Sequence, residues 1–471
     1  MQIDRSRFRK ATLADGRSHA TETCMKTSIL VLGLLTQLSF AQAFSMSNET
    51  CWSAKPILKS AAESKKLEDE QKLCGIDFYS DKYSICPKLN STFPGVLVIK
   101  RSENMSDSEF RNNHCARIDE AKDANIAKVV AKFKQTTSCS HASAPVAYYR
   151  IAEFLGGIKV PVAVFRTMDK SKHLEIAEQA NQIISNNKDL KDDLIAQTWK
   201  RFLALHANPS QYPDVFTNDT VYGALSENIN GEFKFTEVSG VGSYETRYPR
   251  FLKQKPFLAV ASSNSVATLA GGTDLKKLAQ VVTVMKDVSN MVVIDYMLNQ
   301  ADRIGNVHFK FKLLKQEAGK IIESKSETEL DKKTKREIIP ADELARIQAG
   351  EVLVRDTVLK DNDCGISKEN KMREIGALEA IRHMNAKTYR QVQKLASFVE
   401  TTEGQMYFVN ELRIPLNILT SQSSGIKNNI IKAAQILKNN CESGLLKLDL
   451  NLEKLLADAN YRESCAVENA E

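Results

Sequence analysis

One polar loop of this chain carries side chains that can transfer a proton and bind a cation. It lies in the segment Ile294–Phe311, which opens with apolar residues at helical spacing and closes with the alternating apolar residues of a strand. Asp302, Arg303 and Asn306 stand between these two patterns. A carboxylate and a carboxamide in one short loop predict acid–base chemistry or a divalent cation site.

A second polar loop, Asp361-Asn362-Asp363, follows the apolar run Val352–Leu359, which reads as a strand. Taken alone, Asp302-Arg303 is more typical of a helix end with an Asp cap and a surface salt bridge. The second loop, taken alone, is consistent with an ordinary turn, where Asp, Asn and Gly are common. Taken together, the two loops meet the needs of phosphoryl transfer. One Asp would accept the proton of the attacking hydroxyl, while an Asn and a second Asp would hold the cation that neutralises the phosphates.

The elements expected upstream would complete such a site. The β-branched run Gly95–Arg101 predicts a strand that carries Lys100. Pro145 opens a predicted helix, Val146–Leu155, which Gly156-Gly157 stop, and Val160–Phe165 is a second predicted strand.

Other segments are less regular by pattern. We expect Ser106–Lys134 to be polar and helical, and Asn208–Pro256 to be irregular with short strands. A helix capped by Thr273 or Asp274 should run to Lys286, with a separate helix at Ile294–Leu298. Further helices are predicted at Lys371–Val399 and Ile426–Ala457.

The two loops resemble those of a known superfamily. DYMLNQADRIGNVHFKF is similar to the catalytic loop of the atypical kinases, which include the phosphatidylinositol 3- and 4-kinases, the Golgi casein-kinase-type secretory kinases and the CotH-like kinases. VLKDNDCGI resembles their metal-binding Asp-Asn-Gly, and PVAYYRIAEFLGGIKVPVAVFR resembles their N-lobe helix and the strand after it. The resemblance spans roughly 95–399. It implies an α+β, two-lobed protein-kinase-like fold with a small β-containing N-lobe and a mostly helical C-lobe.

The resemblance also implies roles for individual residues. Asp302 would be the catalytic base. Cofactor contacts would come from Lys100 and Arg303, with Lys100 at the α- and β-phosphates. The metal ligands would be Asn306, Asp361 and Asp363. The implied cofactors are ATP with Mg²⁺ or Mn²⁺.

Three departures from the family pattern concern this site. Asn306 comes four residues after Asp302 instead of five, and Asp363 replaces the usual Gly, so it is an alternative ligand to Asp361. Pro145 stands where relatives have the glutamate that pairs with the lysine. Glu153, or Glu109 and Glu120 upstream, are alternative partners, and the choice among them stays open. The departures leave room for a pseudokinase or for a transferase that moves AMP.

The beginning of the chain predicts export. Met25-Lys26, the apolar run Ile29–Leu38 and the small-x-small site Ala41-Gln42-Ala43 form a secretory signal pattern, so 1–43 is interpreted as a leader with a signal peptide. Its removal takes away six basic and three acidic residues and leaves a net charge of +4 from the +7 of the whole chain. So mild a charge gives no indication of a nucleic-acid partner or of an anionic membrane surface.

The cysteines agree with this compartment. Eight of the nine lie beyond the leader, an even number that favours up to four disulfides in an oxidising environment. Spacing does not give their connectivity. No CxxC or HExxH motif indicates a zinc site.

These observations predict five regions along the chain. They are the leader 1–43, a Cys-containing and mostly helical extension 44–94, an N-lobe 95–170, a C-lobe 171–400 with an exposed charged insertion 315–343, and a helical tail 401–471. The expected function is an exported kinase-like phosphotransferase that moves the ATP γ-phosphate to a hydroxyl, with a protein Ser/Thr favoured over a lipid. It would act in the periplasm, the secretory lumen or outside the cell, with no integral membrane segment after signal cleavage. The alternatives are an inactive kinase-fold binding protein and a disulfide-rich structural protein.

Overall fold

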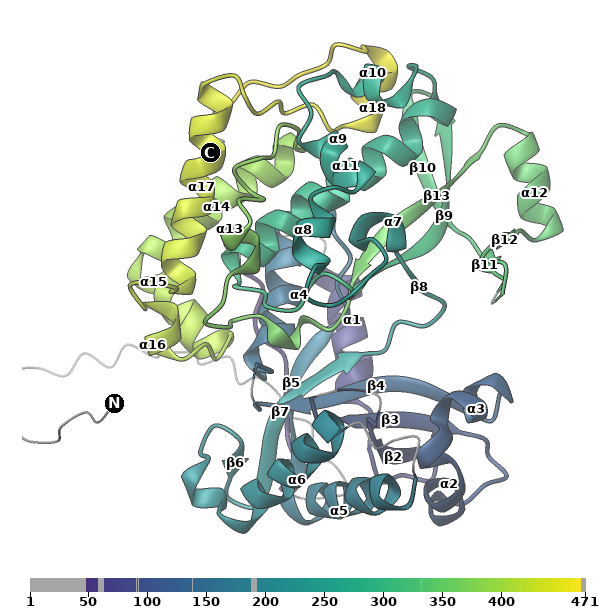
Figure 1. The fold of residues 1–471 in the computed structure, drawn as a ribbon, viewed down its shortest axis with the longest axis vertical. Coiled ribbons are helices and arrows are strands. Elements are labelled where there is room, and N and C mark those ends of the chain that lie inside the picture. The colour runs from purple at the N-terminus through teal and green to yellow at the C-terminus, as the bar shows by residue number, and fades with distance from the viewer. Residues whose placement is uncertain are drawn as a thin grey trace, which may run out of the picture. The chain divides into compact units, whose positions relative to one another are not determined.

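Two antiparallel sheets organise the chain (Figure 1). The computed structural model describes residues 48–466 apart from 58–62, 90, 92, 138, 188–192 and 332, and these residues belong to one compact unit, 40–471. The leader 1–43 with its signal pattern lies outside the described residues. Within the described part of the chain, no helix has the length and apolar character needed to cross a membrane.

The larger sheet has seven strands in the order β1-β5-β7-β4-β3-β2, with β6 paired to β7. Its strands are β1 (Cys51–Trp52), β2 (Tyr83–Pro87), β3 (Val96–Arg101), β4 (Ala127–Gln135), β5 (Ala163–Asp169), β6 (Phe216–Thr217) and β7 (Thr220–Glu227). The predicted strands at 95–101 and 160–165 are β3 and β5. The extension 44–94, expected to be mostly helical, instead supplies β1 and β2 at the two ends of the sheet, together with helix α1 (Glu63–Cys74).

Two central strands of this sheet also differ from the prediction. Strand β4 occupies the end of the segment expected to be polar and helical, where only α2 (Asp107–His114) and α3 (Ile118–Asp123) are α-helical. Strand β7 lies in the segment expected to be irregular with short strands, and it is a strand of eight residues that pairs with both β4 and β5 in the middle of the sheet. Helices α5 (Lys170–Asn186) and α6 (Asp193–Ala207) precede it; α5 packs with β2, β5 and β7, and α6 packs on α5. The core between them includes Phe133, Trp199 and Phe202.

The smaller sheet is β10-β9-β13, with β8 paired to β9, and it follows the candidate loop directly. Its strands are β8 (Phe233–Lys234), β9 (Val307–Glu317), β10 (Lys320–Lys325) and β13 (Val352–Leu359). The charged insertion 315–343 was expected to be only exposed, but it is structured: β10 pairs along β9, β11 (Glu329–Leu330) pairs with β12 (Glu337–Ile338), and α12 (Ala341–Gln348) follows.

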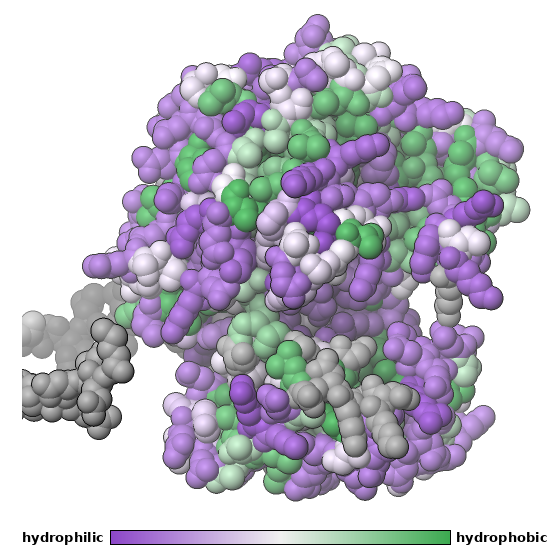
Figure 2. Space-filling view, in the orientation of Figure 1, coloured by the Kyte–Doolittle hydropathy of each residue, from purple (hydrophilic) through white to green (hydrophobic). Residues whose placement is uncertain are grey.

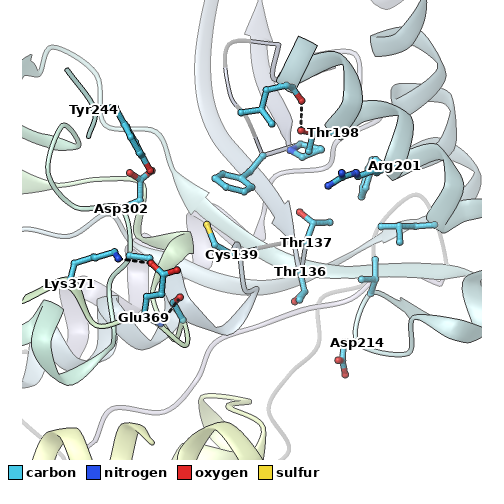
Figure 3. A pocket seen from close by; sticks show the side chains of 18 of the residues that line it. Thr136, Thr137, Cys139, Thr198, Arg201, Asp214, Tyr244, Asp302, Glu369 and Lys371 are labelled. Carbon is cyan, nitrogen blue, oxygen red and sulfur yellow. Dashed lines mark hydrogen bonds and ion pairs between the residues drawn. The ribbon is translucent and has the colours of Figure 1, made fainter. Parts of the chain in front are cut away.

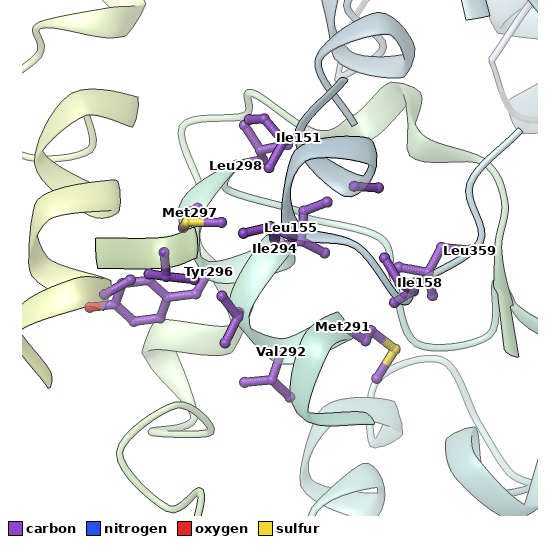
Figure 4. Close-up of a cluster of buried hydrophobic side chains, with 14 of the residues drawn as sticks. Ile151, Leu155, Ile158, Met291, Val292, Ile294, Tyr296, Met297, Leu298 and Leu359 are labelled. Carbon is purple, nitrogen blue, oxygen red and sulfur yellow. The ribbon is translucent and has the colours of Figure 1, made fainter. Parts of the chain in front are cut away.

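One long helix, α11 (Leu275–Met297), leads into the first candidate loop. The sequence predicted two helices here, but the chain is helical throughout, and the Asp274 side chain caps the start by accepting from the Lys277 amide at 3.1 Å. The last turns are buried, and Figure 4 shows Ile294, Met297 and Leu298 packed with Ile151 and Leu155 of α4 (Ser143–Leu155). This core fixes the point at which the loop begins.

Several of the remaining helices pack on α11. The remaining helices are α7 (Thr236–Ser239), α8 (Arg247–Phe251), α9 (Lys255–Val260), α10 (Val266–Ala270), α13 (Lys371–Glu374), α14 (Ala386–Glu400), α15 (Thr402–Met406), α16 (Leu416–Leu419), α17 (Ile426–Glu442) and α18 (Leu452–Ala457), with a π-helical turn at Tyr407–Glu411. Those that pack on α11 are α9, α10, α13, α17 and α18. Helix α17 packs on α14 and α11, so the predicted tail 401–471 contributes to the main core. The view in Figure 2 is mostly hydrophilic, with scattered hydrophobic areas that are ordinary for a protein surface.

Four disulfides join the eight cysteines beyond the leader. They are Cys51–Cys74, Cys86–Cys115, Cys139–Cys364 and Cys441–Cys465. The prediction of up to four disulfides is confirmed, and the architecture is mixed α+β with antiparallel sheets.

Candidate functional site

A buried arginine joins the two polar loops. Arg303 is fully buried and forms an ion pair with Asp295 of α11, at 2.9 Å between Nε and Oδ2. Its Nη1 donates to the Lys360 carbonyl at 2.8 Å, and its Nη2 donates to Asn362 Oδ1 at 2.6 Å. The loop after α11 and the loop after β13 are therefore neighbours, although they are far apart along the chain.

The opposite end of the second loop is also held. Cys364 forms its disulfide with Cys139, which precedes α4. The His141 amide donates to the Asp363 carbonyl at 2.8 Å, and the Ala301 amide donates to the Cys364 carbonyl at 3.2 Å. The loop 361–365 is thus tied both to the start of α4 and to the loop that carries the predicted base.

Asp302 lies beside an arginine side chain, Arg247, that the sequence did not indicate. Its Oδ1 is 2.5 Å from Nη1 of Arg247, which comes from α8. Asn306 donates through Nδ2 to the Asp302 carbonyl at 2.8 Å and to its carboxylate at 3.4 Å, and neither bond uses the Asn306 Oδ1 that would ligate a metal. Burial raises the pKa of Asp302, Arg247 opposes this, and the nearby charges of Asp361 and Asp363 raise it further. Those charges show that all three carboxylates share one electrostatic environment.

Asp363 pairs with a lysine of the larger sheet, and Asp361 lies near Lys88, which follows β2. Lys134 Nζ of β4 lies 2.6 Å from Asp363 Oδ2, and Lys88 Nζ lies 3.7 Å from Asp361 Oδ1. The charge of Lys88 keeps the pKa of Asp361 well below its ordinary value. Burial raises the pKa of Asp363, but Lys134 outweighs it and the net direction is downward. Both carboxylates are therefore ionised at neutral pH.

A small cavity of about 40 Å³ lies at this pair of carboxylates. Its walls come from β4, β7, the start of α4 and the second loop, and they include Lys132, Lys134, Pro145, Pro161, Ser226, Glu227, Lys360, Asp361, Asn362 and Asp363. Three of these residues are lysines, so the cavity can accept an anion next to two carboxylates that can accept a cation.

Asp302 also borders a much larger open cleft of about 1310 Å³ (Figure 3). In this view Asp302 and Tyr244 lie on one side, and Thr198 and Arg201 of α6 lie on the other. The Tyr244 ring stacks on Arg247, whose guanidinium carbon is 3.6 Å from the ring centroid. The predicted base is thus open to a bulky acceptor, while the two carboxylates face the small cavity.

The predicted cofactor residues lie in different environments. Lys100 is exposed on β3, where it is in register with Tyr83 and Lys128. Lys134 lies near the other end of β3, since its neighbour Phe133 is in register with Val96. Because a strand rises about 3.3 Å per residue, Lys100 and Lys134 are well separated along the sheet. The structure therefore brings Lys134, and not Lys100, to the carboxylates. Arg303 is brought to the site but is enclosed by protein groups.

The position of the expected N-lobe glutamate is also visible. Pro145 of α4 lines the small cavity together with Lys134, so the position on α4 where relatives would have the glutamate has no carboxylate. Of the proposed substitutes, Glu153 pairs with Arg150 on its own helix at 2.8 Å and Glu120 lies near Arg117 at 3.8 Å. The acidic partner that Lys134 has instead is Asp363.

The donor set suits a hard divalent cation in its chemistry. Two ionised carboxylates and a free amide oxygen are the ligand types that Mg²⁺ and Mn²⁺ take, usually completed by substrate phosphates. Among the residues that the structure describes, no group of three or more His, Cys, Asp or Glu side chains is arranged as a metal site. Asp361 and Asp363 provide only two, so Asn306 or a phosphate would have to complete the set.

In comparisons with known proteins, no protein-family model and no curated protein matches the chain.

Proposed function

We propose that this protein is a kinase-like phosphotransferase that moves the γ-phosphate of ATP to a hydroxyl acceptor. The observation that carries the proposal is the junction made by Arg303. It holds together one loop that exposes a carboxylate to an open cleft and another loop that exposes two ionised carboxylates to a lysine-lined cavity.

The architecture supports a two-lobed kinase-like fold. Strands β2, β3 and β4 are followed by α4, then by β5 and β7 of the same sheet, and then by the smaller sheet and the helices around α11. This order matches the small β-containing lobe and larger helical lobe that the resemblance implies. Under this proposal Lys134 takes the role that the sequence suggested for Lys100.

Each residue would have a distinct part in the reaction. Asp302 would accept the proton of the hydroxyl that enters from the cleft, and its raised pKa makes it a stronger base than an ordinary aspartate. Asn306, Asp361 and Asp363 would hold Mg²⁺ or Mn²⁺, which when bound neutralises the phosphates. Arg303 would act as a positioning residue, because its donors are used within the protein.

The small cavity places a condition on nucleotide binding. At about 40 Å³ it is far below the roughly 300–1,000 Å³ of ordinary ligand sites. ATP binding therefore requires the walls between the larger sheet and the second loop to separate, with the phosphates replacing the Lys134–Asp363 and Lys88–Asp361 contacts.

The acceptor side favours a protein Ser or Thr over a lipid. The cleft beside Asp302, at about 1310 Å³, exceeds the usual small-molecule range and suits a polypeptide segment. Its charged lining includes both signs, for example Arg201 and Asp214, and so lacks the uniformly basic character that selects a phosphoinositide headgroup. Four disulfides support action in the periplasm, the secretory lumen or the extracellular space.

One observation favours a second candidate, a kinase-fold binding protein without catalysis. The predicted base is already paired with Arg247, and Asp363 is already paired with Lys134. In this case the contacts would be permanent features of an inactive site.

Radiolabel transfer separates the candidates. Protein lacking 1–43 is incubated with γ-labelled ATP, Mn²⁺ and dephosphorylated casein, alongside vesicles containing phosphatidylinositol. The proposal predicts label on the protein acceptor, lost in Asp302→Asn and kept in Asp107→Asn, an acidic residue at the start of the distant helix α2. Label from α-labelled ATP alone would indicate AMP transfer, and the absence of any transfer would favour the binding protein.

A further inference from the structure

The small cavity is surrounded by four lysines. Lys132, Lys134 and Lys360 line it, and Lys88 lies beside it against Asp361. Three of these lysines, Lys88, Lys134 and Lys360, are buried. Burying a charge is unfavourable unless a partner of opposite sign accompanies it, so the pairing of each lysine is informative.

Three of the four lysines have a partner. Lys88 lies near Asp361, Lys134 pairs with Asp363, and Lys360 pairs with Glu232. Lys132 is the fourth, and within the described part of the chain it has no ion pair. It is half-buried and lines the cavity itself.

Strand geometry explains why Lys132 points toward the site. Successive side chains of a strand alternate between its faces, so Lys132 and Lys134 of β4 share one face, while Ala131 and Phe133 share the other. The apolar pair packs in the core of the larger sheet. Lys132 is in register with Ser226 of β7, which also lines the cavity.

We infer that Lys132 binds a phosphate group of a polyphosphate ligand in this cavity, as a second cation beside Lys134. The inference rests on the proposed function and adds a residue to it. A lone ammonium directed into a small cavity, with paired ammoniums around it, has the chemistry of an anion site. The adjacent carboxylates would hold the cation that accompanies a polyphosphate.

The electrostatics of the free protein agree with an anionic ligand. Burial lowers the pKa of Lys132 to about 7; Asp361 opposes the shift, while Lys88, Lys360 and Lys134 add to it. Glu227, Asp361 and Asp363 are the acids on the cavity wall. A phosphate beside Lys132 would give this lysine the ion pair that the other three lysines already have.

The test measures binding of two probes, inorganic tripolyphosphate and ATP, each with Mn²⁺, by titration calorimetry on protein lacking 1–43. Lys132→Met should weaken the binding of both probes by roughly tenfold to a hundredfold, the usual effect of losing a charge-assisted hydrogen bond. Lys132→Arg should stay within about threefold of wild type, because it keeps the charge. Lys128→Met is the control, since Lys128 is an exposed lysine of the same strand, and the register shift between β3 and β4 puts it on the face opposite to Lys132.

The outcomes separate this inference from the proposed function. If wild type binds ATP and Lys132→Met binds it equally well, the inference is overturned and the proposed function stands. If wild type binds tripolyphosphate through Lys132 but does not bind ATP, the inference stands and the proposed function fails. Binding of neither probe overturns both. Equal losses of affinity in Lys132→Met and Lys132→Arg would mean that the shape of the side chain matters and its charge does not, which also overturns the inference. If the Lys132→Met protein does not fold, Lys132→Gln replaces it.

Discussion

Replacing Arg303 with Met should destabilise the protein strongly, because this side chain joins three separate elements without any exposure to solvent. It pairs with Asp295 at 2.9 Å and donates to the second loop at 2.8 and 2.6 Å. Its removal leaves the Asp295 carboxylate buried, with the Tyr148 hydroxyl at 2.8 Å as a neutral donor. Breaking a buried ion pair in this way costs about 3–5 kcal/mol.

The assay is chemical unfolding followed by circular dichroism, with a second variant that tests the cause. In Arg303→Met/Asp295→Leu the orphaned carboxylate is gone, so the double variant should be more stable than Arg303→Met alone. Arg355→Met is the control, because its partners Glu237 and Glu337 lie at the surface and such pairs contribute less than about 1 kcal/mol.

The proposed nucleotide site should respond as well. Without Arg303 the two loops lose their direct link, so metal-dependent ATP binding should weaken even at temperatures where the variant is folded. A free energy of unfolding for Arg303→Met within about 1 kcal/mol of the wild-type value would contradict this prediction. So would a double variant, Arg303→Met/Asp295→Leu, that is no more stable than Arg303→Met.

Three further predictions concern the frame around the site. Burial lowers the pKa of His206 to about 4 and that of His173 well below its ordinary value, so the folded state binds fewer protons than the unfolded state. The free energy of unfolding should therefore be at its full value above pH 6.5 and fall as the pH drops toward 4. An equally steep fall in His206→Gln would contradict this prediction. Replacing Cys139 and Cys364 with Ser removes a disulfide with a sequence separation of 225 residues, and the chain-entropy model gives a loss of about 5 kcal/mol in the free energy of unfolding. Chemical unfolding measures this loss. The control lacks the Cys441–Cys465 disulfide, whose separation of 24 residues gives a smaller loss. In Gly223→Ala the new Cβ would lie 2.6 Å from a carbonyl oxygen of β4, so the melting temperature should fall with about 1–3 kcal/mol of stability, and an unchanged value would show that β7 adjusts at no cost.

The sequence predicted the site's two loops better than the sheet that faces them. Local patterns were sufficient for Ile294–Phe311 and Val352–Leu359, because helices and strands each have a recognisable period and turns have a recognisable polar composition. Strand β4, which carries Lys134, was missed although part of its signal was present. Ala127, Val129, Ala131 and Phe133 are apolar at every second position, and the residues between them are lysines except for Val130. The many charges around them were interpreted as a helical surface.

Other features could not be read from local pattern at all. Lys100 and Lys134 both lie on strands of one sheet, and only the pairing of β4 with β7 shows which of them meets the second loop. Arg247 contacts Asp302 from a segment interpreted as irregular, and no spacing links the two. The cysteine pairs likewise depend on the tertiary fold.

Metal-dependent nucleotide binding is the most direct test of the account. Titration of ATP into protein lacking 1–43 should give saturable binding with Mn²⁺, little binding with a chelator, and loss of the metal-dependent part in Asp361→Ala. Binding that is identical with and without the cation, or unchanged in Asp361→Ala and Asp363→Ala, would contradict the claim that these loops converge on one cation and a polyphosphate.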